Sequence, residues 1–209
     1  MAIPAVFAWP LSDTQAISLT QSTGATGNLL LNGNLALNGF VVFQGLGRTV
    51  SLTSAGDNSG VNFTITGSRY GRPIVEVIAG PNADTVETVN VFDTINSISV
   101  SAAVTAVSVG TGTTGATNWF NSNYHRNVLG QTVQVIVTGT INYTYLTTLD
   151  DVDTNPTPTG FPTIVGMTAA TTNQIGSYLS PARFSKISIN SSNATGALVA
   201  TFLEQGILG

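Results

Sequence analysis

The chain has 209 residues, no cysteine, 8% charged residues and a formal net charge of −4. Without cysteine there is no disulfide framework, thiolate metal ligand or cysteine nucleophile, and six Lys and Arg residues are too few for nucleic-acid binding through phosphates. Charged residues usually make up about 25% of a soluble domain, so uncharged Thr, Ser, Asn and Gly are expected to form most of the surface.

The N-terminal segment, residues 1–46, is expected to form an extended arm followed by hairpins. The first ten residues are apolar and contain no basic residue, and their two prolines would break a helix, so no secretion signal is expected. No apolar run approaches the roughly 20 residues of a membrane helix, and we expect no membrane partner. Asn-Gly steps at residues 32–33 and 38–39 predict tight turns.

Residues 47–149 are expected to form the main β core, because polar and apolar residues alternate through them. The longest pattern, residues 131–145, contains Gly139, which predicts a bulge or sharp bend. Its valines should share one buried face: Val133, Val135 and Val137. Short strands separated by Gly, Asn and Pro turns predict an all-β antiparallel sandwich, of jelly-roll or immunoglobulin-like type.

The last two segments complete what we expect to be one domain, residues 1–209. Residues 150–182 show little periodicity and are expected to form a long loop, and loops of that length usually have a function or contact another molecule. Residues 183–209 are expected to form a C-terminal β-hairpin, with a turn-rich stretch at 191–196.

Two acidic or serine-containing stretches resemble functional motifs but lack their spacing. Asp150, Asp151 and Asp153 resemble a calcium loop, yet prolines stand where an EF-hand has its Gly and Glu. Residues 56–60 resemble the Gly-Asp-Ser-Gly-Gly motif of serine proteases, but the additional Asn58 breaks the spacing. We expect a solvated acidic turn at the first and a hairpin turn at the second.

His125 is the only histidine, so there is no second histidine to share a metal ion. As a general base it would need a carboxylate and a nucleophile from distant loops. We therefore expect no catalytic residue, no metal ligand and no cofactor, and a protein that is not an enzyme.

Aromatic and cationic residues gather in one stretch: Trp119, Phe120, Tyr124, His125 and Arg126. Trp, Tyr and Arg are favoured anchors of protein interfaces. We expect a subunit contact or a core cap here, with a stacking platform for sugar as the alternative.

The two ends of the chain supply the other candidate interface residues: Ile3, Phe7, Trp9 and Leu208. Residues 1–9 could dock on the chain's own sandwich or on another subunit. We expect the second, because the charges that normally guard edge strands are scarce and neighbouring subunits could cover those edges.

Several strings in this order are distinctive: SAGDNSGVNFTITG at residues 54–67, AGPNA at 79–83, VFDTINSISV at 91–100 and VSVGTG at 107–112. TGTINYT at 138–144, with LDD at 149–151, and ATGALVATF at 194–202 follow them. Together they resemble small β-rich structural proteins of tailed bacteriophages.

This resemblance implies a non-enzymatic virion protein, first of all a capsid decoration (cement) protein that stabilises the head lattice. A tail-fibre or neck component, or a carbohydrate-binding adhesive module, is the alternative. The implied partners are other copies of the chain, as a homotrimer, and a major capsid or other virion protein. The implied location is the virion, assembled in the cytoplasm of a bacterial host.

Overall fold

The computed structural model describes residues 5–122, 128–155, 157–179 and 182–206. All regular elements in these ranges are β-strands, and the sheets are antiparallel. The expected all-β antiparallel sandwich-like fold is therefore confirmed.

The chain forms two compact units, although a single domain was expected. The inserted unit is Ser12–Gly115, and the terminal unit combines Met1–Leu11 with Ala116–Gly209. The second boundary falls inside a continuous strand, β11 (Val104–Thr117). Because the strand runs through it, this boundary does not coincide with a turn or a linker.

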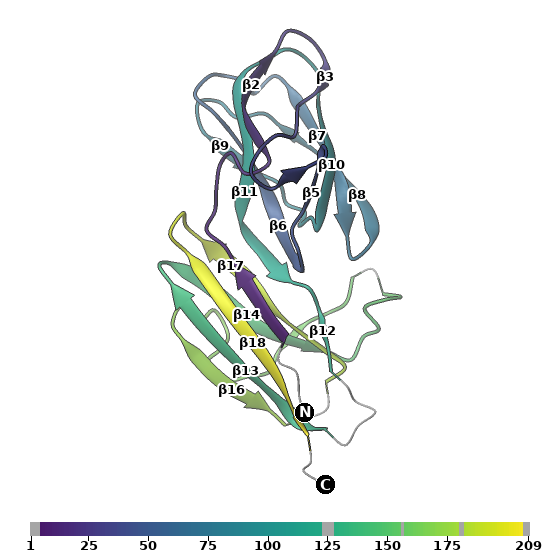
Figure 1. Ribbon diagram of the computed structural model, residues 1–209, viewed down its shortest axis with the longest axis vertical. Coiled ribbons are helices and arrows are strands. Elements are labelled where there is room, and N and C mark those ends of the chain that lie inside the picture. The colour runs from purple at the N-terminus through teal and green to yellow at the C-terminus, as the bar shows by residue number, and fades with distance from the viewer. Residues whose placement is uncertain (1–4, 123–127, 156, 180–181, 207–209) are drawn as a thin grey trace. The chain divides into compact units, whose positions relative to one another are not determined.

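The terminal unit contains a four-stranded sheet in the order β1-β18-β13-β16. In Figure 1 the purple β1 runs beside the yellow β18. A second group of strands has the order β15-β14-β17, with β12 also paired to β17. The bounds are β1 (Ala5–Trp9), β12 (Phe120–Asn121), β13 (Val128–Thr138), β14 (Ile141–Thr148), β15 (Phe161–Pro162), β16 (Gln174–Tyr178), β17 (Phe184–Ser192) and β18 (Ala197–Gly206).

Two adjacent turns carry the chain from one sheet of the terminal unit to the other. Gly139, between β13 and β14, has a φ of +68°, and a side chain there would meet the carbonyl oxygen of Thr195. The N–H of Asn193, between β17 and β18, donates to the carbonyl oxygen of Thr140 at 3.2 Å. The sharp bend expected at Gly139 is confirmed.

The same turns explain why residues 183–209 do not form the expected hairpin. Strand β17 pairs with β14, whereas β18 pairs with β13 and β1 in the other sheet. Alternation of polar and apolar residues predicts which side of a strand is buried, but it does not choose the strand's partner.

Phe202 on β18 lies at the centre of the terminal core. Its ring contacts those of Phe7 edge-on at 5.5 Å between centroids and of Phe120 in a stack at 5.4 Å. Val133 and Val135 are fully buried, and Val137 on the same side of β13 is half-buried. The expected shared face of these valines is confirmed.

Residues 150–182 are more ordered than the long loop expected from their sequence. They contain β15 and β16, and Tyr143 and Ala170 exchange two backbone hydrogen bonds of 2.9 and 2.8 Å. Ile164 and Met167 from this segment are buried in the core. The strands are only two and five residues long, too short for a periodic pattern to reveal them.

The inserted unit also contains two groups of strands. One has the order β4-β5-β10-β7-β8, with β3 paired to β10; in the other, β6 lies between β9 and β11, and β2 pairs with β11. The bounds are β2 (Ser18–Thr23), β3 (Gly27–Asn28), β4 (Ala36–Leu37), β5 (Phe40–Val42), β6 (Leu46–Ser54), β7 (Asn62–Arg69), β8 (Arg72–Ala79), β9 (Thr85–Glu87) and β10 (Thr94–Val100).

The inserted unit contains one expected turn and one buried arginine. Asn38 and Gly39 have φ angles of +53° and +82° and join β4 to β5, so the tight turn expected at 38–39 is confirmed. Arg48 is fully buried and donates to the hydroxyl of Ser12 at 3.1 Å and to the carbonyl of Gly112 at 3.0 Å. Burial lowers the pKa of Arg48 to about 10, and the charge of Glu87 opposes this shift.

Candidate functional site

The outward side of the sheet β1-β18-β13-β16 carries the most distinctive surface of the terminal unit. Because side chains alternate along each strand, the residues next to those that face the core point to the outward side of the sheet. Five large apolar residues are exposed there by 39–70% and define what we call the apolar sheet face: Val6, Ile136, Ile175, Val199 and Leu203.

The strand register makes this face continuous across all four strands. Val199 on β18 pairs with Ala8 on one side and with Ile136 on the other. Farther along, Gln134 pairs with Thr201 and with Ile175. These paired positions are all uncharged, so the described part of the face has an apolar and amide character without a fixed charge.

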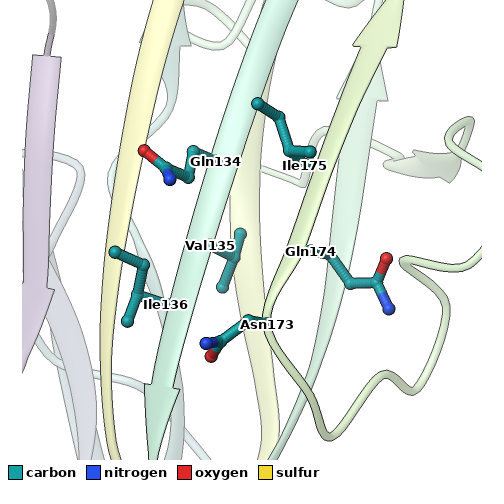
Figure 2. Close-up of a pocket in the computed structure, with 6 residues that line it drawn as sticks. All are labelled: Gln134, Val135, Ile136, Asn173, Gln174 and Ile175. Atoms are coloured by element: carbon teal, nitrogen blue, oxygen red, sulfur yellow. The ribbon is translucent and has the colours of Figure 1, made fainter.

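A shallow groove of about 380 Å³ lies between β13 and β16 on this sheet. Figure 2 shows Gln134 and Ile136 projecting from β13 and Ile175 projecting from the neighbouring β16. The groove is lined by six uncharged residues: Gln134, Val135, Ile136, Asn173, Gln174 and Ile175. Asn173 closes its end by accepting a hydrogen bond from the backbone of Val137 at 2.8 Å.

The two edge strands of the same sheet are β1 and β16. Their sequences, AVFAW and QIGSY, contain no charged residue. Edge strands are usually protected by Lys, Pro or a bulge, because their free backbone groups can pair with another chain. This sheet therefore combines an apolar face with two edges that carry no such charge.

The aspartates of the suspected calcium loop organise their own segment. The Asp150 carboxylate accepts hydrogen bonds from Asn155 at 3.2 Å and from the backbone of Thr159 at 2.8 Å. Asp151 forms an ion pair with Arg183 at 3.2 Å. Desolvation pushes the pKa of Asp151 upward, but the backbone N–H of Asp153 and the charge of Arg183 outweigh it, and the net shift is downward.

No group of three or more His, Cys, Asp or Glu side chains that could hold a metal ion occurs within the described ranges. His125 lies outside the described residues.

Of the aromatic and cationic cluster, the structure places Trp119 and Phe120. The ammonium of Lys186 lies 4.3 Å from the centre of the Trp119 ring. A side chain at position 160 would come within 3.3 Å of that ring, so Trp119 packs beneath the segment before β15. Phe120 stacks on Phe202 in the core. Tyr124 and Arg126 lie outside the described residues.

The N-terminal candidates dock on the chain's own sandwich. Trp9 is only 2% exposed, and Phe7 packs edge-on against Phe202. The other side of β1 presents Val6, which is 59% exposed. Docking of Phe7 and Trp9 within the chain replaces the contact with another subunit that we expected for them. Ile3 and Leu208 lie outside the described residues.

The residues of the apolar sheet face were missed in the sequence analysis. The sequence contained part of the evidence for this face. Ile136 stands between Val135 and Val137, so its side chain must point to the opposite side of the strand from theirs. However, a face becomes visible only when the order of the strands is known, and β1, β13, β16 and β18 are far apart in the sequence.

Comparison of the chain with protein-family models, curated proteins and solved structures finds no match. The described residues include no helix that is long and apolar enough to span a membrane.

Proposed function

We propose that this chain is a non-enzymatic structural protein of a tailed-bacteriophage virion, and specifically a capsid decoration protein that stabilises the head lattice. It would assemble with copies of itself, as a homotrimer, and with the major capsid protein or another virion protein. The apolar sheet face is the observation that carries this proposal.

An exposed apolar face of this kind favours binding to another protein surface over a monomeric state. Contiguous apolar patches on soluble proteins mark interaction sites, and the cores of interfaces are depleted of charge. Burying the apolar sheet face would not require the desolvation of an ion, which is the main energetic obstacle to burying polar surface.

The two edges of the sheet support a closed ring of copies. Edge-to-edge pairing of β16 from one copy with β1 of the next would repeat one heterologous contact. Such a contact closes into a ring when the rotation between copies allows it. A trimer is the ring that the resemblance to virion proteins implies.

The first test is the oligomeric state of the full-length chain by sedimentation velocity and native mass spectrometry. We expect a trimer, and we expect the double variant Ile136→Lys/Ile175→Lys to be monomeric because it places two charges on the apolar sheet face, one of them on the edge strand β16 that would pair with the next copy. Both positions are well exposed, so the variant should remain folded by circular dichroism.

The matched control is Val75→Lys/Val77→Lys, which adds the same charges at two similarly exposed valines of β8 in the inserted unit. It should leave the trimer unchanged. A wild-type chain that stays monomeric at about 100 μM, well above the micromolar dissociation constants of weak assemblies, and is absent from mass spectra of purified virions would contradict the proposal.

A further inference from the structure

A second hollow, of about 250 Å³, opens in the terminal unit where β14 ends. It is bordered by Thr147 on β14, by the segment that follows this strand, by Phe161 on β15 and by Tyr178 at the end of β16. These residues belong to paired strands. Thr147 on β14 pairs with Phe161 on β15, and Tyr178 on β16 pairs with Gln131 on β13, so the lining residues come from two sheets. A hollow built on paired strands keeps its shape better than one built on loops alone.

The walls of this pocket expose rings and alkyl groups to solvent. Phe161 is 60% exposed and Leu149 is 73% exposed, while Tyr178 is half-buried. Aromatic faces carry partial negative charge, and they attract groups with a partial positive edge, such as polarised C–H bonds.

Asp150 lines the pocket, and hydrogen bonds hold its carboxylate in place. Its backbone N–H donates to the Thr148 hydroxyl at 3.0 Å, and its Oδ2 accepts from Thr159 and Asn155. Its other oxygen, Oδ1, has no hydrogen-bond partner among the described residues. A carboxylate held in this way needs no further ordering to accept a hydrogen bond from a ligand.

Hydroxyl groups complete the polar part of the lining. The Thr147 hydroxyl donates to the Thr163 hydroxyl at 3.4 Å, and Tyr178 adds a phenol. Each hydroxyl can both donate and accept. The pocket thus offers aromatic and alkyl walls, several hydroxyls and one carboxylate, with no cationic side chain among its described lining residues.

We propose that this pocket binds a single pyranose ring of a neutral glycan. The apolar C–H face of the ring would stack against Phe161 or Tyr178, and its hydroxyls would donate to Asp150 Oδ1 and exchange hydrogen bonds with the threonines. Because the described lining residues include one carboxylate and no cation, they disfavour sugar acids. The pocket is lined by different residues from the apolar sheet face, so glycan binding adds to the assembly role and does not depend on it.

The test is a titration of the ¹⁵N-labelled full-length chain, followed by NMR, with the methyl glycosides of glucose, galactose, mannose and N-acetylglucosamine. Methyl glucuronide serves as the anionic probe. We expect at least one neutral glycoside to give saturable shifts at the amides of Thr147 and Thr163 with a dissociation constant of about 1 mM, typical of weak ligands. Methyl glucuronide should bind at least about tenfold more weakly, because its carboxylate would face Asp150.

Two variants tie the binding to this pocket. Phe161→Ala removes the stacking wall and Asp150→Asn removes the charge, and each should weaken binding about tenfold. Phe40→Ala is the matched control, since Phe40 is an exposed phenylalanine of the inserted unit and should not affect binding. The absence of saturable shifts with all four neutral glycosides would overturn the proposal, as would preference for methyl glucuronide or unchanged binding by both pocket variants.

Discussion

Gln131 on β13 is the centre of a buried polar cluster in the terminal core. Its Oε1 accepts hydrogen bonds from the Tyr145 hydroxyl at 2.8 Å and from the Ser185 hydroxyl, and its Nε2 donates to Ser122 at 3.4 Å. Burial raises the pKa of the Tyr145 phenol, while the contact with Ser185 opposes the shift, so the phenol remains a neutral donor. One side chain thereby joins strands of both sheets.

We predict that Gln131→Ala destabilises the chain by about 2–4 kcal/mol, because it leaves two buried hydroxyl groups without an acceptor. Tyr145→Phe is the matched control and should cost only about 1 kcal/mol, since Gln131 keeps its hydrogen bond with Ser185. Urea unfolding measures both values. Equal costs for the two variants would show that the cluster does not act through unsatisfied groups.

The burial of Gln131 could be predicted from the sequence, but its hydrogen-bond partners could not. It shares the parity of Val133 and Val135, so the alternating pattern already places it on the buried side of its strand. Its partners lie 14 and 54 residues away on strands of the other sheet. Pairing over such distances depends on strand order, which local patterns do not contain.

Among the elements, β1 shows most directly how one strand serves two surfaces. Trp9 points into the core at 2% exposure, while Val6 lies on the apolar sheet face. The apolar character of this segment was apparent in the sequence, but its partner, β18, lies at the other end of the chain. The sequence was therefore compatible with docking of this segment on the chain's own sandwich and with docking on another subunit.

We predict that Trp9→Ala lowers the free energy of unfolding by about 3–5 kcal/mol, the usual cost of removing a large buried aromatic side chain. Val6→Ala should change it by less than about 0.5 kcal/mol, because that side chain is largely in solvent. Urea denaturation of a chain kept monomeric by Ile136→Lys/Ile175→Lys separates these effects from assembly. A Trp9→Ala variant as stable as its parent would mean that β1 is not part of the folded core.

For the whole molecule, the division into two units was the feature least visible in the sequence. The inserted unit, Ser12–Gly115, is one continuous segment, whereas the terminal unit is assembled from both ends of the chain. The boundary after Gly115 falls inside the continuous strand β11, so it does not coincide with a turn or a linker. The class of fold was predictable because short alternating strands recur throughout, but the grouping of those strands was not.

We predict that a fragment of residues 12–115 folds alone, because its strands β2 to β10 keep their pairing partners and it has its own core. It should give a β-type circular dichroism spectrum and a cooperative urea transition. A fragment of residues 116–209 lacks β1 and Trp9 and should be less stable than the same unit in the intact chain. If residues 12–115 prove unfolded in water, the inserted unit depends on the rest of the chain.

The pairing of β1 with β18 also sets an order of events on the ribosome. Trp9 pairs with Leu198, so β1 is synthesised long before its partner strand, β18. At 5–20 residues per second this delay is roughly 10–40 s. During this delay β1 has no partner strand, whereas the inserted unit, Ser12–Gly115, is complete well before Leu198 is added and can fold first. Until β18 is made, the segment Ala5–Trp9 is therefore an exposed apolar strand that is prone to non-native association.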